Sequence, residues 1–372
     1  MAPKCVVFDN GSGTIKAGFC GNQTPKVISP SIIGHSKDQK KETYIGSEAQ
    51  SRRGLLSIQY PIEQGNITNY DDLEKLWQHI FVNELQVDSK EQRIFASTAS
   101  FTQKSQHERI TERLFEKFKT PAYFTAWSAV MALAAQNRDT GVVWDSGFGT
   151  SHVVPVHDGT PLHNIAGRFD VAGDDISDYM KQILNQREGS AFSKLSQVDQ
   201  KEAANAIKEK IGYVAQDYEY DIQIAARPEK SLDKNYELPD GKNITVGRER
   251  FMAPEANFQV TLVGLSQPAL SAEIFNSVMK AKASLRPKLF GNIVFAGGNT
   301  LFPGFKRRLQ KELTGNSSLA GIQVKIEAPD NRLYSVWAGG SMLASLRTFE
   351  NHWISKEEYA EVGASIVHRK CL

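Results

Sequence analysis

Two short stretches of the sequence share a pattern that is suited to phosphate chemistry. VVFDNGSGTIKAGF and VVWDSGFGTSHVV each contain Asp-x-Gly-x-Gly-Thr, beginning at Asp9 and at Asp145. The copies lie 145 − 9 = 136 residues apart, which is too long for a solenoid repeat and suits a duplicated domain. Glycines where a strand ends let backbone N–H groups approach an anion, because no Cβ stands in the way. The repeat therefore predicts two phosphate-binding turns.

The side chains of the two turns extend this prediction to a metal ion. In the first copy, Ser12 supplies a hydroxyl donor and Lys16 a positive charge, both suited to phosphate oxygens. We expect Asp9 and Asp145 to face each other across a cleft. Two carboxylates beside a polyphosphate suit Mg²⁺, which keeps bound waters and takes few direct protein ligands. A single Asp-x-Gly-x-Gly is more often an ordinary hairpin, but two copies, one with Lys16, favour phosphate binding.

A third glycine stretch, IVFAGGNTLFPGF, also follows an apolar run. Gly297 and Gly298 permit close approach of the backbone to a ligand. Pro303 is expected in the first turn of a helix that carries Phe305 and Leu309. By itself this stretch is more typical of an ordinary strand–turn–helix connection than of a binding site.

Length and composition exclude several classes of protein. The 372 residues are enough for two domains with their own cores, and the net charge of +2 gives no field that favours nucleic acid or a membrane surface. The cysteines Cys5, Cys20 and Cys371 lack metal-ligand spacing, and their odd number favours a reducing compartment. The start of the chain has no apolar signal region. We therefore expect a protein of the cytoplasm or, alternatively, the nucleus.

Local patterns indicate an α/β protein. Short apolar runs that end in Gly or Asp predict buried strands at residues 5–8, 142–144, 152–156, 292–296 and 323–326. Apolar residues at helical spacing predict helices near residues 73–85, 110–118, 176–184 and 198–214. Thr68-x-x-Asp71 and Ser196-x-x-Asp199 are expected to begin two of them. Strands mixed with helices of this length are typical of an α/β protein.

Six segments together resemble the actin and actin-related protein family: DNGSGTIKAGF, YPIEQG, DSGFGTSHVVP, AGGNTLFPGF, YSVWAGGSMLASL and SIVHRKCL. The match runs in register over essentially the whole chain. It implies an actin-like α/β fold in which two similar domains surround a cleft for ATP or ADP with Mg²⁺ or Ca²⁺. The outer domain would comprise residues 1–136 plus 335–372, with an inserted subdomain near 31–68. The inner domain would comprise residues 137–334.

The resemblance also assigns nucleotide-binding roles to particular positions. The first phosphate turn would consist of Gly11, Ser12, Gly13, Thr14 and Lys16, and the second of Asp145, Gly147, Gly149 and Thr150. Gly297, Gly298, Asn299 and Phe302 match the turn that binds adenosine, Lys208 and Glu209 match adenine and ribose contacts, and Gly173 matches another turn facing the nucleotide. Without the resemblance, Lys208 and Glu209 would be assigned to a solvated helix face.

Departures from the family pattern bear on hydrolysis. Ser128 stands where the family pattern has a glutamine that positions the attacking water, and serine is too short to span the same gap. His152 is retained at a position associated with that water, although a histidine alone is equally suited to a structural role. Together with Asp145, these residues form a weakened catalytic set. The resemblance therefore implies slow ATP hydrolysis.

Further departures surround the expected nucleotide. Phe148 replaces an acid expected at the ribose, and it would lie either beside the sugar or in a core. Gln64 replaces a histidine, Leu333 replaces a basic residue near the adenine, and Asp174 replaces an arginine. Taken together, these changes suggest that the nucleotide acts mainly as a structural link between the two halves.

Segments that make filament and partner contacts in the family also depart from its pattern. The loop at residues 35–42 is short and rich in lysine, and the start MAPK lacks an acidic cluster. Apolar residues at 262–270 would form either a plug between filament strands or a packed loop. A helical stripe of Leu343, Leu346 and Phe349 would form either core or a docking groove, with Ala134 in place of an opposing aromatic residue.

Two interpretations of function follow. The first is a divergent actin or actin-related protein that is a structural subunit of a filament or of a cytoskeletal, motor-linked or chromatin-linked complex. Its partners would be actin-like subunits and actin-binding proteins, without direct nucleic-acid or membrane contact. The second is a conventional actin ATPase that forms dynamic filaments. A sugar kinase or chaperone ATPase would use similar turns, but no sugar-reading acid cluster or peptide-binding domain is evident in the sequence.

Overall fold

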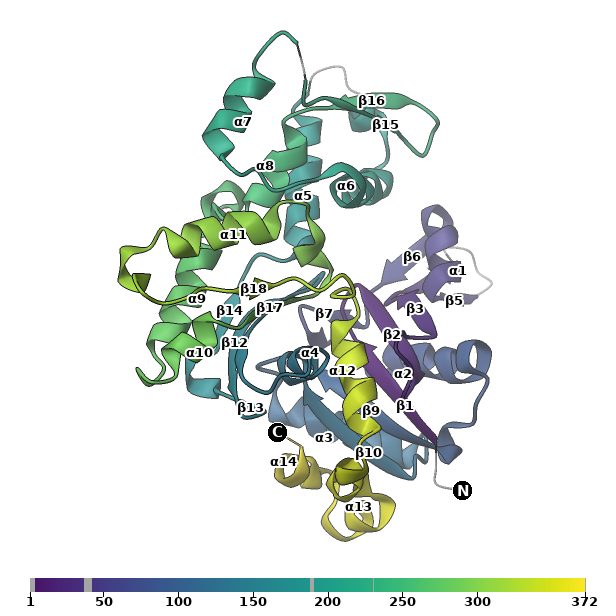
Figure 1. The fold of residues 1–372 in the computed structure, drawn as a ribbon. Coiled ribbons are helices and arrows are strands. Elements are labelled where there is room, and N and C mark those ends of the chain that lie inside the picture. The colour runs from purple at the N-terminus through teal and green to yellow at the C-terminus, as the bar shows by residue number, and fades with distance from the viewer. Residues whose placement is uncertain (1–3, 37–41, 188–190, 230, 372) are drawn as a thin grey trace.

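The fold is built on two mixed β-sheets. The computed structural model describes residues 4–36, 42–187, 191–229 and 231–371, and Figure 1 shows the two sheets and the helices around them. The first sheet has the order β19 (Ile354–Ser355), β10 (Ala122–Trp127), β9 (Gln92–Thr98), β1 (Lys4–Asn10), β2 (Thr14–Phe19) and β3 (Val27–Pro30). The second has the order β13 (Thr160–Pro161), β12 (Ser151–His157), β11 (Gly141–Ser146), β17 (Ile293–Ala296) and β18 (Ile326–Glu327), with β14 (Gly167–Phe169) paired to β12.

The two sheets repeat one local plan around a hairpin. In the first sheet, β1 and β2 form an antiparallel hairpin, and β1 also pairs in parallel with β9. In the second, β11 and β12 form the hairpin, and β11 pairs in parallel with β17. Strands covered on both faces are expected to be continuously apolar, and Val6, Val7, Val142, Val143 and Trp144 are fully buried. The mixed α/β class predicted from the sequence is confirmed.

Three of the five predicted strands lie within β1, β11 and β12, and the fourth, at residues 292–296, begins one residue before β17. The fifth prediction, at residues 323–326, is largely wrong, since β18 covers only Ile326 and Glu327. The reason is that this segment bonds elsewhere: the carbonyl of Val324 accepts from Gln310 Nε2 (2.8 Å), and the N–H of Lys325 donates to the carbonyl of Phe290 (2.9 Å).

Helices surround the two sheets. Their bounds are α1 (Gly46–Ser51), α2 (Tyr70–His79), α3 (Lys104–Glu116), α4 (Ser128–Ala134), α5 (Gly173–Asn185), α6 (Gln197–Ile211), α7 (Tyr218–Ala225), α8 (Glu249–Glu255), α9 (Leu270–Met279), α10 (Arg286–Phe290), α11 (Phe305–Thr314), α12 (Ser335–Ala344), α13 (Lys356–Val362) and α14 (Val367–Lys370). The four predicted helices correspond to α2, α3, α5 and α6, and a π-helical segment at Ile80–Leu85 continues α2.

The helix starts differ in detail from the sequence prediction. Ser196 caps α6 as expected, because its Oγ accepts from the N–H of Asp199 (3.1 Å). The cap of α2 is Asn69 rather than Thr68: Asn69 Oδ1 accepts from the N–H of Asp72 (3.1 Å). Pro303 also lies outside its predicted helix, since α11 begins two residues later, at Phe305.

The C-terminal segment returns to the first sheet. The indole N–H of Trp337, on α12, donates to the carbonyl of Val7 (3.0 Å), and β19 pairs with β10. Helices α12 and α4 cross so closely that a Cβ on Gly339 would lie 1.7 Å from the carbonyl oxygen of Met131. A glycine at this crossing is therefore needed for the contact. The domain boundaries proposed from the sequence stay predictions.

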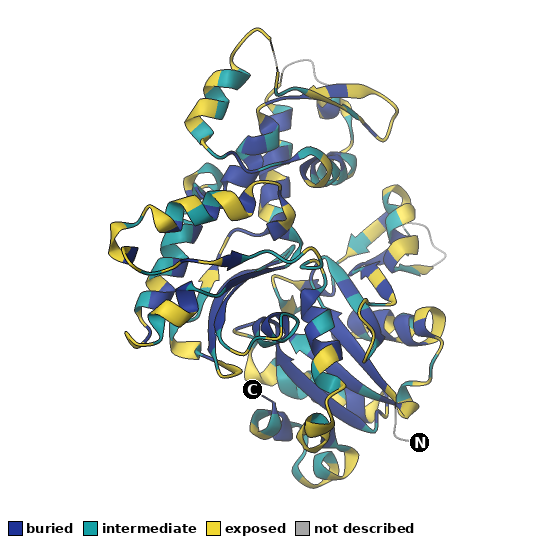
Figure 2. Cartoon of the chain, in the orientation of Figure 1, coloured by how far each residue is buried: buried dark blue, intermediate teal, exposed yellow. Residues whose placement is uncertain are grey.

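Smaller units complete the chain. A three-stranded sheet, β5 (Thr43–Ile45), β4 (Ile33–Ser36) and β6 (Leu56–Gln59), packs with α1 around a small core of Ile32, Ala49 and Leu56. Two further hairpins are β7 (Ile62–Glu63) with β8 (Asn66–Ile67), and β15 (Lys234–Glu237) with β16 (Asn243–Val246). Figure 2 shows burial concentrated in the two large sheets and in the helix faces against them.

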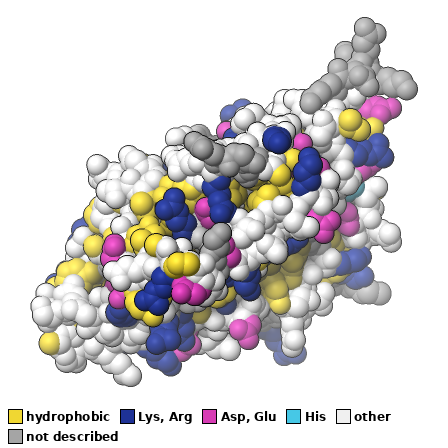
Figure 3. Space-filling view, turned by 90° about the horizontal axis from the view of Figure 1, so that it is seen from above, with side chains coloured by type: hydrophobic (Ala, Val, Ile, Leu, Met, Phe, Trp, Pro, Cys, Tyr) yellow, Lys and Arg dark blue, Asp and Glu magenta, His cyan; other side chains and the backbone are white. Residues whose placement is uncertain are grey.

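The surface carries mixed charge. The face seen from above in Figure 3 has Lys and Arg interspersed with Asp and Glu, together with scattered hydrophobic side chains. Among the helices that the structure describes, none is long and apolar enough to span a lipid bilayer. Residues 37–41, which belong to the lysine-rich loop, and the first three residues of the chain lie outside the described residues.

Candidate functional site

One cavity of about 580 Å³ lies between the two large sheets, within the size range of small-molecule sites. It collects residues from both halves of the sequence. All but one of the predicted site residues line it: Asp9, Gly11, Ser12, Gly13, Thr14, Lys16, Ser128, Asp145, Gly147, Gly149, Thr150, Gly173, Lys208, Glu209, Gly297, Gly298, Asn299 and Phe302. The exception is His152.

The two hairpin turns approach each other directly. A Cβ on Gly13 would lie 2.6 Å from Cβ of Phe148, and a Cβ on Gly149 would lie 3.0 Å from Cβ and Oγ of Ser12. A Cβ at residue 13 would force the opposite turn to move, because Cβ contacts below 3 Å are not tolerated, and a Cβ at residue 149 would require Ser12 to shift by a few tenths of an ångström. The N–H of Gly65 donates to Ser12 Oγ (3.2 Å) and adds a third segment to the contact.

Backbone donors of both turns are free to bind a ligand. In the first turn, the N–H groups of Ser12 and Gly13 have no hydrogen-bond acceptor within the described part of the chain. In the second turn, the same holds for Phe148 and Gly149 among the described residues. Because partly buried N–H groups need a partner, two facing sets of free donors are suited to an anion such as a polyphosphate.

Asp9 is held by two neighbours in the first sheet. It stands opposite Lys16 in the β1–β2 register, and Lys16 Nζ lies 3.1 Å from Asp9 Oδ2. Ser97, on β9, donates its hydroxyl to Asp9 Oδ1 (2.7 Å). The side chains of Asp9 and Lys16 are 13% and 11% exposed, so this ion pair is largely removed from water and fixed in direction.

Asp145 lies opposite, in the second sheet. Ser128, at the start of α4, donates its hydroxyl to Asp145 Oδ2 (2.6 Å). Loss of solvation raises the pKa of the Asp145 carboxyl, the Ser128 hydroxyl opposes this shift, and the negative charge of Asp9 adds to it. Asp9 and Asp145 both line the cavity, and the charge of Asp9 is close enough to affect the pKa of Asp145. A cation between the two carboxylates would relieve their repulsion.

His152 lies away from the cavity lining. It is the register partner of Asp145 on β12, but it is only 4% exposed, and its ring packs against that of Phe101 with centroids 5.5 Å apart. Burial lowers the pKa of His152 to about 4, and the positive charge of Arg168 acts in the same direction. The imidazole is therefore neutral at physiological pH. The structure brings together every other residue of the predicted site, but not this one.

The third glycine stretch forms one wall of the cavity. Gly297 has φ of +86°, and a Cβ there would lie 2.1 Å from the carbonyl oxygen of Ser146. Asn299 Nδ2 donates to Ser146 Oγ (2.9 Å) and ties this wall to the end of β11. Leu333 approaches Gly298, with Cδ1 3.3 Å from where a Cβ would stand. This wall is therefore apolar where Leu333 and Phe302 line it.

Lys208 approaches the cavity from α6. Its Nζ donates to the carbonyl of Gly173 (2.7 Å) and to Ser177 Oγ (2.9 Å), both on α5. Burial lowers the pKa of Lys208 to about 8, and nearby carboxylates, Glu209 foremost, limit the shift. Lys208 thus joins α5 and α6 at the cavity wall, and its ammonium group becomes easier to deprotonate.

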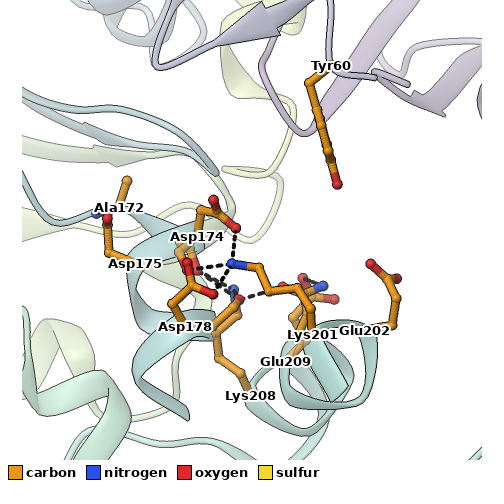
Figure 4. A network of polar contacts seen from close by, with 12 residues as sticks. Tyr60, Ala172, Asp174, Asp175, Asp178, Lys201, Glu202, Lys208 and Glu209 are labelled. Atoms are coloured by element: carbon orange, nitrogen blue, oxygen red, sulfur yellow. Dashed lines mark hydrogen bonds and ion pairs between the residues drawn. The ribbon is translucent and has the colours of Figure 1, made fainter. Parts of the chain in front are cut away.

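A second lysine of α6 forms an ion-pair network with α5. Lys201 Nζ lies 2.7 Å from Asp174 Oδ1 and 2.6 Å from Asp178 Oδ1. Figure 4 shows Lys201 between these two carboxylates, with Tyr60 pointing toward the network from the other side of the site. Glu209 Oε1 accepts from Asn205 Nδ2 (3.1 Å). Asp174, which replaces the arginine of the family pattern, is therefore paired with Lys201 of the same chain.

Phe148 faces the cavity. It lines the cavity, and its ring is stacked on that of Tyr60, with centroids 6.2 Å apart and an interplanar angle of 16°. Of the two alternatives left open by the sequence, a position in a core is excluded. Because Tyr60 follows β6 and Phe148 lies in the second turn, the stack joins the two sides of the site.

Sequence reasoning missed a set of contacts across the cavity. Glu202, on α6, accepts from Gln50 Nε2 (2.7 Å) and lies 3.1 Å from Arg53 Nη1. All three residues line the cavity. A usable signal was the spacing of Glu202, Asn205 and Glu209, since residues three and seven positions on share one face of a helix.

The fold and the cavity define an α/β protein in which two sheets with matching hairpin turns enclose one site. The family model described as actin matches residues 2–372, essentially the whole chain. The protein belongs to the actin family, as the resemblance implied. Members of this family generally bind ATP or ADP with a divalent cation.

The residues of this chain fit such a ligand. Free N–H groups face each other across the cavity, and Lys16 and two carboxylates stand beside them. Among the described residues, no group of three or more His, Cys, Asp or Glu could hold a metal ion. A divalent cation beside the phosphates would be held by Asp9 and Asp145, which both line the cavity, together with waters and phosphate oxygens, a ligand set that suits Mg²⁺.

Proposed function

We propose that this member of the actin family binds ATP or ADP with Mg²⁺, or alternatively Ca²⁺, and hydrolyses ATP slowly. Its role would be that of a structural subunit in a filament or a multiprotein complex. The observation that carries this proposal is the hydrogen bond of 2.6 Å from the Ser128 hydroxyl to Asp145. Ser128 stands where the family pattern has a glutamine that positions the attacking water. A serine hydroxyl that already donates to Asp145 would not take over that role.

The phosphates would lie between the two turns. Donors of the first turn and the charge of Lys16 would bind from one side, and donors of the second turn from the other. The divalent cation supplies positive charge that offsets the charge of the polyphosphate. Gly297, Gly298 and Phe302 would form the wall for the rest of the nucleotide, with Lys208 and Glu209 opposite.

Slow hydrolysis follows from what is missing beside the phosphates. An attacking water must be held in line, and loss of such positioning costs roughly 100-fold in rate. The Ser128 hydroxyl already donates to Asp145, and His152 is buried against Phe101 outside the cavity lining. With the Ser128 hydroxyl engaged by Asp145 and His152 outside the lining, neither side chain would orient a water at the phosphate end.

A bound nucleotide would then serve mainly as a link between the two sheets. A ligand that binds only the folded state stabilises it by about 2.7 kcal/mol at a concentration 100 times its dissociation constant. The cavity is lined by both hairpin turns and by α6, so a ligand in it touches both halves. Nucleotide removal should therefore lower the melting temperature.

The proposal of actin-binding partners rests on the family relationship and on an exposed apolar surface near the end of α12. Leu346 is 49% and Met342 is 37% exposed near the end of α12, whereas Phe349 packs against Phe95 and Phe124 in the core. This exposed pair suits an actin-binding protein or another subunit of a cytoskeletal, motor-linked or chromatin-linked complex. The apolar loop at residues 262–270 packs partly against the core of the second sheet, through Leu262, Val263 and Leu265. This contact favours the interpretation as a packed loop over that as a plug between filament strands.

The test is to follow phosphate release and pelleting of the purified protein in Mg-ATP at rising protein concentration. We expect slow release without a sharp critical concentration. Brisk release coupled to a sharp critical concentration would instead support the alternative, a conventional polymerising actin ATPase.

Ser128→Gln tests the role of the short side chain. Its longer amide can reach beyond Asp145, so phosphate release should be faster by roughly tenfold or more. Ser57→Gln, at an exposed position of β6, is the matched control and should leave the rate unchanged. An unchanged rate in Ser128→Gln would contradict the argument about water placement.

A further inference from the structure

Two of the three cysteines lie side by side at the base of the β1–β2 hairpin. The register that pairs Val6 with Phe19 places Cys5 directly opposite Cys20, and the N–H of Cys20 donates to the carbonyl of Cys5 (3.0 Å). Directly opposite residues of antiparallel strands point to the same face. The two side chains therefore lie next to each other, and each affects the pKa of the other.

The geometry of this pair is compatible with a disulfide. Opposite residues joined by backbone hydrogen bonds have Cα atoms about 5.5 Å apart, and disulfides span Cα separations of roughly 4.4–6.8 Å. Both cysteines are free thiols in the structure. Directly opposite Cβ atoms are about 4.5–5.5 Å apart, and a disulfide spans about 3.5–4.5 Å between them. A covalent bond would therefore need side-chain rotation and a small approach of the two strands.

A positive charge lies in the same row of the sheet. Arg93, on β9, is the register partner of Cys5, so Cys20, Cys5 and Arg93 stand on three adjacent strands. Arg93 Nη2 lies 2.7 Å from Glu350 Oε1, which fixes the guanidinium in place. Its charge acts on both sulfurs. Ser345, at the end of α12, adds a hydroxyl beside Cys20.

The two thiols are unequal. Cys20 is partly exposed, whereas Cys5 is buried. The hydrogen bond from Cys5, with the Ser345 hydroxyl and Arg93, lowers the pKa of Cys20 to about 6 against the opposing effect of burial, while burial raises the pKa of Cys5 well above its ordinary value. Cys20 is therefore a thiolate at neutral pH, and Cys5 remains its protonated neighbour. Low-pKa, accessible thiolates with an adjacent cysteine are the pattern of redox-sensitive sites.

We propose that Cys5 and Cys20 form a peroxide-sensitive dithiol, in which Cys20 is the reacting cysteine and Cys5 the resolving one. The Cys20 thiolate attacks one oxygen of hydrogen peroxide, so that an S–O bond forms, the O–O bond breaks and hydroxide leaves. Cys5 sulfur then attacks Cys20 sulfur: the S–S bond forms, the S–O bond breaks, and the leaving hydroxide takes the Cys5 proton as water. Peroxide is reduced by two electrons, and the two thiols are oxidised by two.

The experiment treats the full-length protein with hydrogen peroxide and measures its intact mass and tryptic peptides without reduction. The disulfide removes two hydrogen atoms, and it should join the peptide of residues 5–16 to that of residues 17–26. Cys371 is the matched control, because it is buried and its pKa is raised to about 12 by burial. Cys371→Ser should form the same linked peptide as the wild type.

Variants of the pair separate the two roles. In Cys5→Ala, Cys20 should be trapped as a sulfenic acid that reacts with dimedone, and the pH midpoint of its alkylation by iodoacetamide should rise by at least one unit. In Cys20→Ser, peroxide should leave Cys5 and Cys371 reduced. The proposal would be overturned if wild-type protein kept all three thiols, or if Cys20 were alkylated with the pH dependence of an ordinary cysteine.

Discussion

The two Asp-x-Gly-x-Gly-Thr turns have the same backbone plan but different chemistry. In the first, the residue opposite the aspartate is Lys16, which turns to Asp9 and lines the cavity. In the second, the corresponding residue is His152, which packs against Phe101. Asp145 instead accepts a hydrogen bond from the hydroxyl of Ser128. The position opposite the aspartate thus holds a charged side chain at the cavity in the first sheet and a buried, packed side chain in the second.

This difference indicates a division of labour. The first turn carries a permanent positive charge for phosphate oxygens, whereas the second offers backbone donors and a carboxylate whose pKa is raised by desolvation. Binding then needs both turns, but charge attraction depends mainly on the first. The predictions below test this asymmetry.

Lys16→Met should have the largest effect. It removes the charge of the first turn and leaves Asp9 buried without its partner, so the free energy of unfolding should fall by about 3–5 kcal/mol. Affinity for ATP should fall about 10- to 100-fold, the equivalent of a lost charged hydrogen bond. Thermal unfolding and titration with a fluorescent ATP analogue measure the two effects.

Two controls separate stability from binding in this experiment. The double variant Asp9→Asn/Lys16→Met has no buried unpaired charge and should regain most of the stability but none of the affinity. Lys26→Met, at an exposed lysine, should change neither. If Lys16→Met bound ATP as tightly as the wild type, the charge of the first turn would have no role in binding.

His152→Leu should change how stability depends on pH. The pKa of His152 is lowered from 6.5 to about 4, so its contribution is present above pH 6.5 and is lost as the pH falls toward 4. The wild type should therefore lose about 3 kcal/mol more than the variant over this interval. Urea unfolding at several pH values measures this difference.

The matched control for this measurement is His157→Leu, at a partly exposed histidine on the same strand. It should keep the wild-type slope. ATP hydrolysis in His152→Leu should equal that of the wild type, and a large loss of hydrolysis would restore His152 to the catalytic set.

Tyr60→Ala should have a smaller effect. Removing the stack on Phe148 costs the interaction of an aromatic pair, about 0.5–1.5 kcal/mol, and nucleotide release should become about 2- to 10-fold faster. Tyr60→Phe keeps the ring but loses the hydrogen bond from Arg53 Nη2 (2.8 Å). It should release nucleotide at the wild-type rate, and an equal acceleration in both variants would assign the effect to that hydrogen bond instead. Stopped-flow displacement of the analogue measures the rate.

Much of the fold could be predicted from the sequence because it rests on local pattern. Apolar runs that end in Gly or Asp located strands of the two hairpins. The repeat also predicted glycines in the turns for close approach to an anion, whereas the contact of Gly13 and Gly149 with the opposite turn appears only in the structure. The strand predicted at residues 323–326 was largely wrong because the backbone there forms hydrogen bonds with the Gln310 side chain of α11 and with the carbonyl of Phe290. Backbone partners of this kind leave no trace in hydrophobic periodicity.

The rest of the site depends on tertiary contacts. Register alone places His152 beside Asp145, but its orientation depends on Phe101, which has a positive φ of 67° and lies some fifty residues earlier. The pairing of Lys201 with Asp174 and Asp178 requires α5 to cross α6. None of these contacts follows from the spacing of residues within one element.

The most direct test of the account is ATP binding by Gly13→Ala and Gly149→Ala, measured by calorimetry beside Gly54→Ala, whose added Cβ meets nothing within 4 Å. If two facing turns bind one polyphosphate, each of the first two variants loses at least tenfold in affinity and Gly54→Ala loses none. Wild-type affinity in either Gly13→Ala or Gly149→Ala would contradict the account.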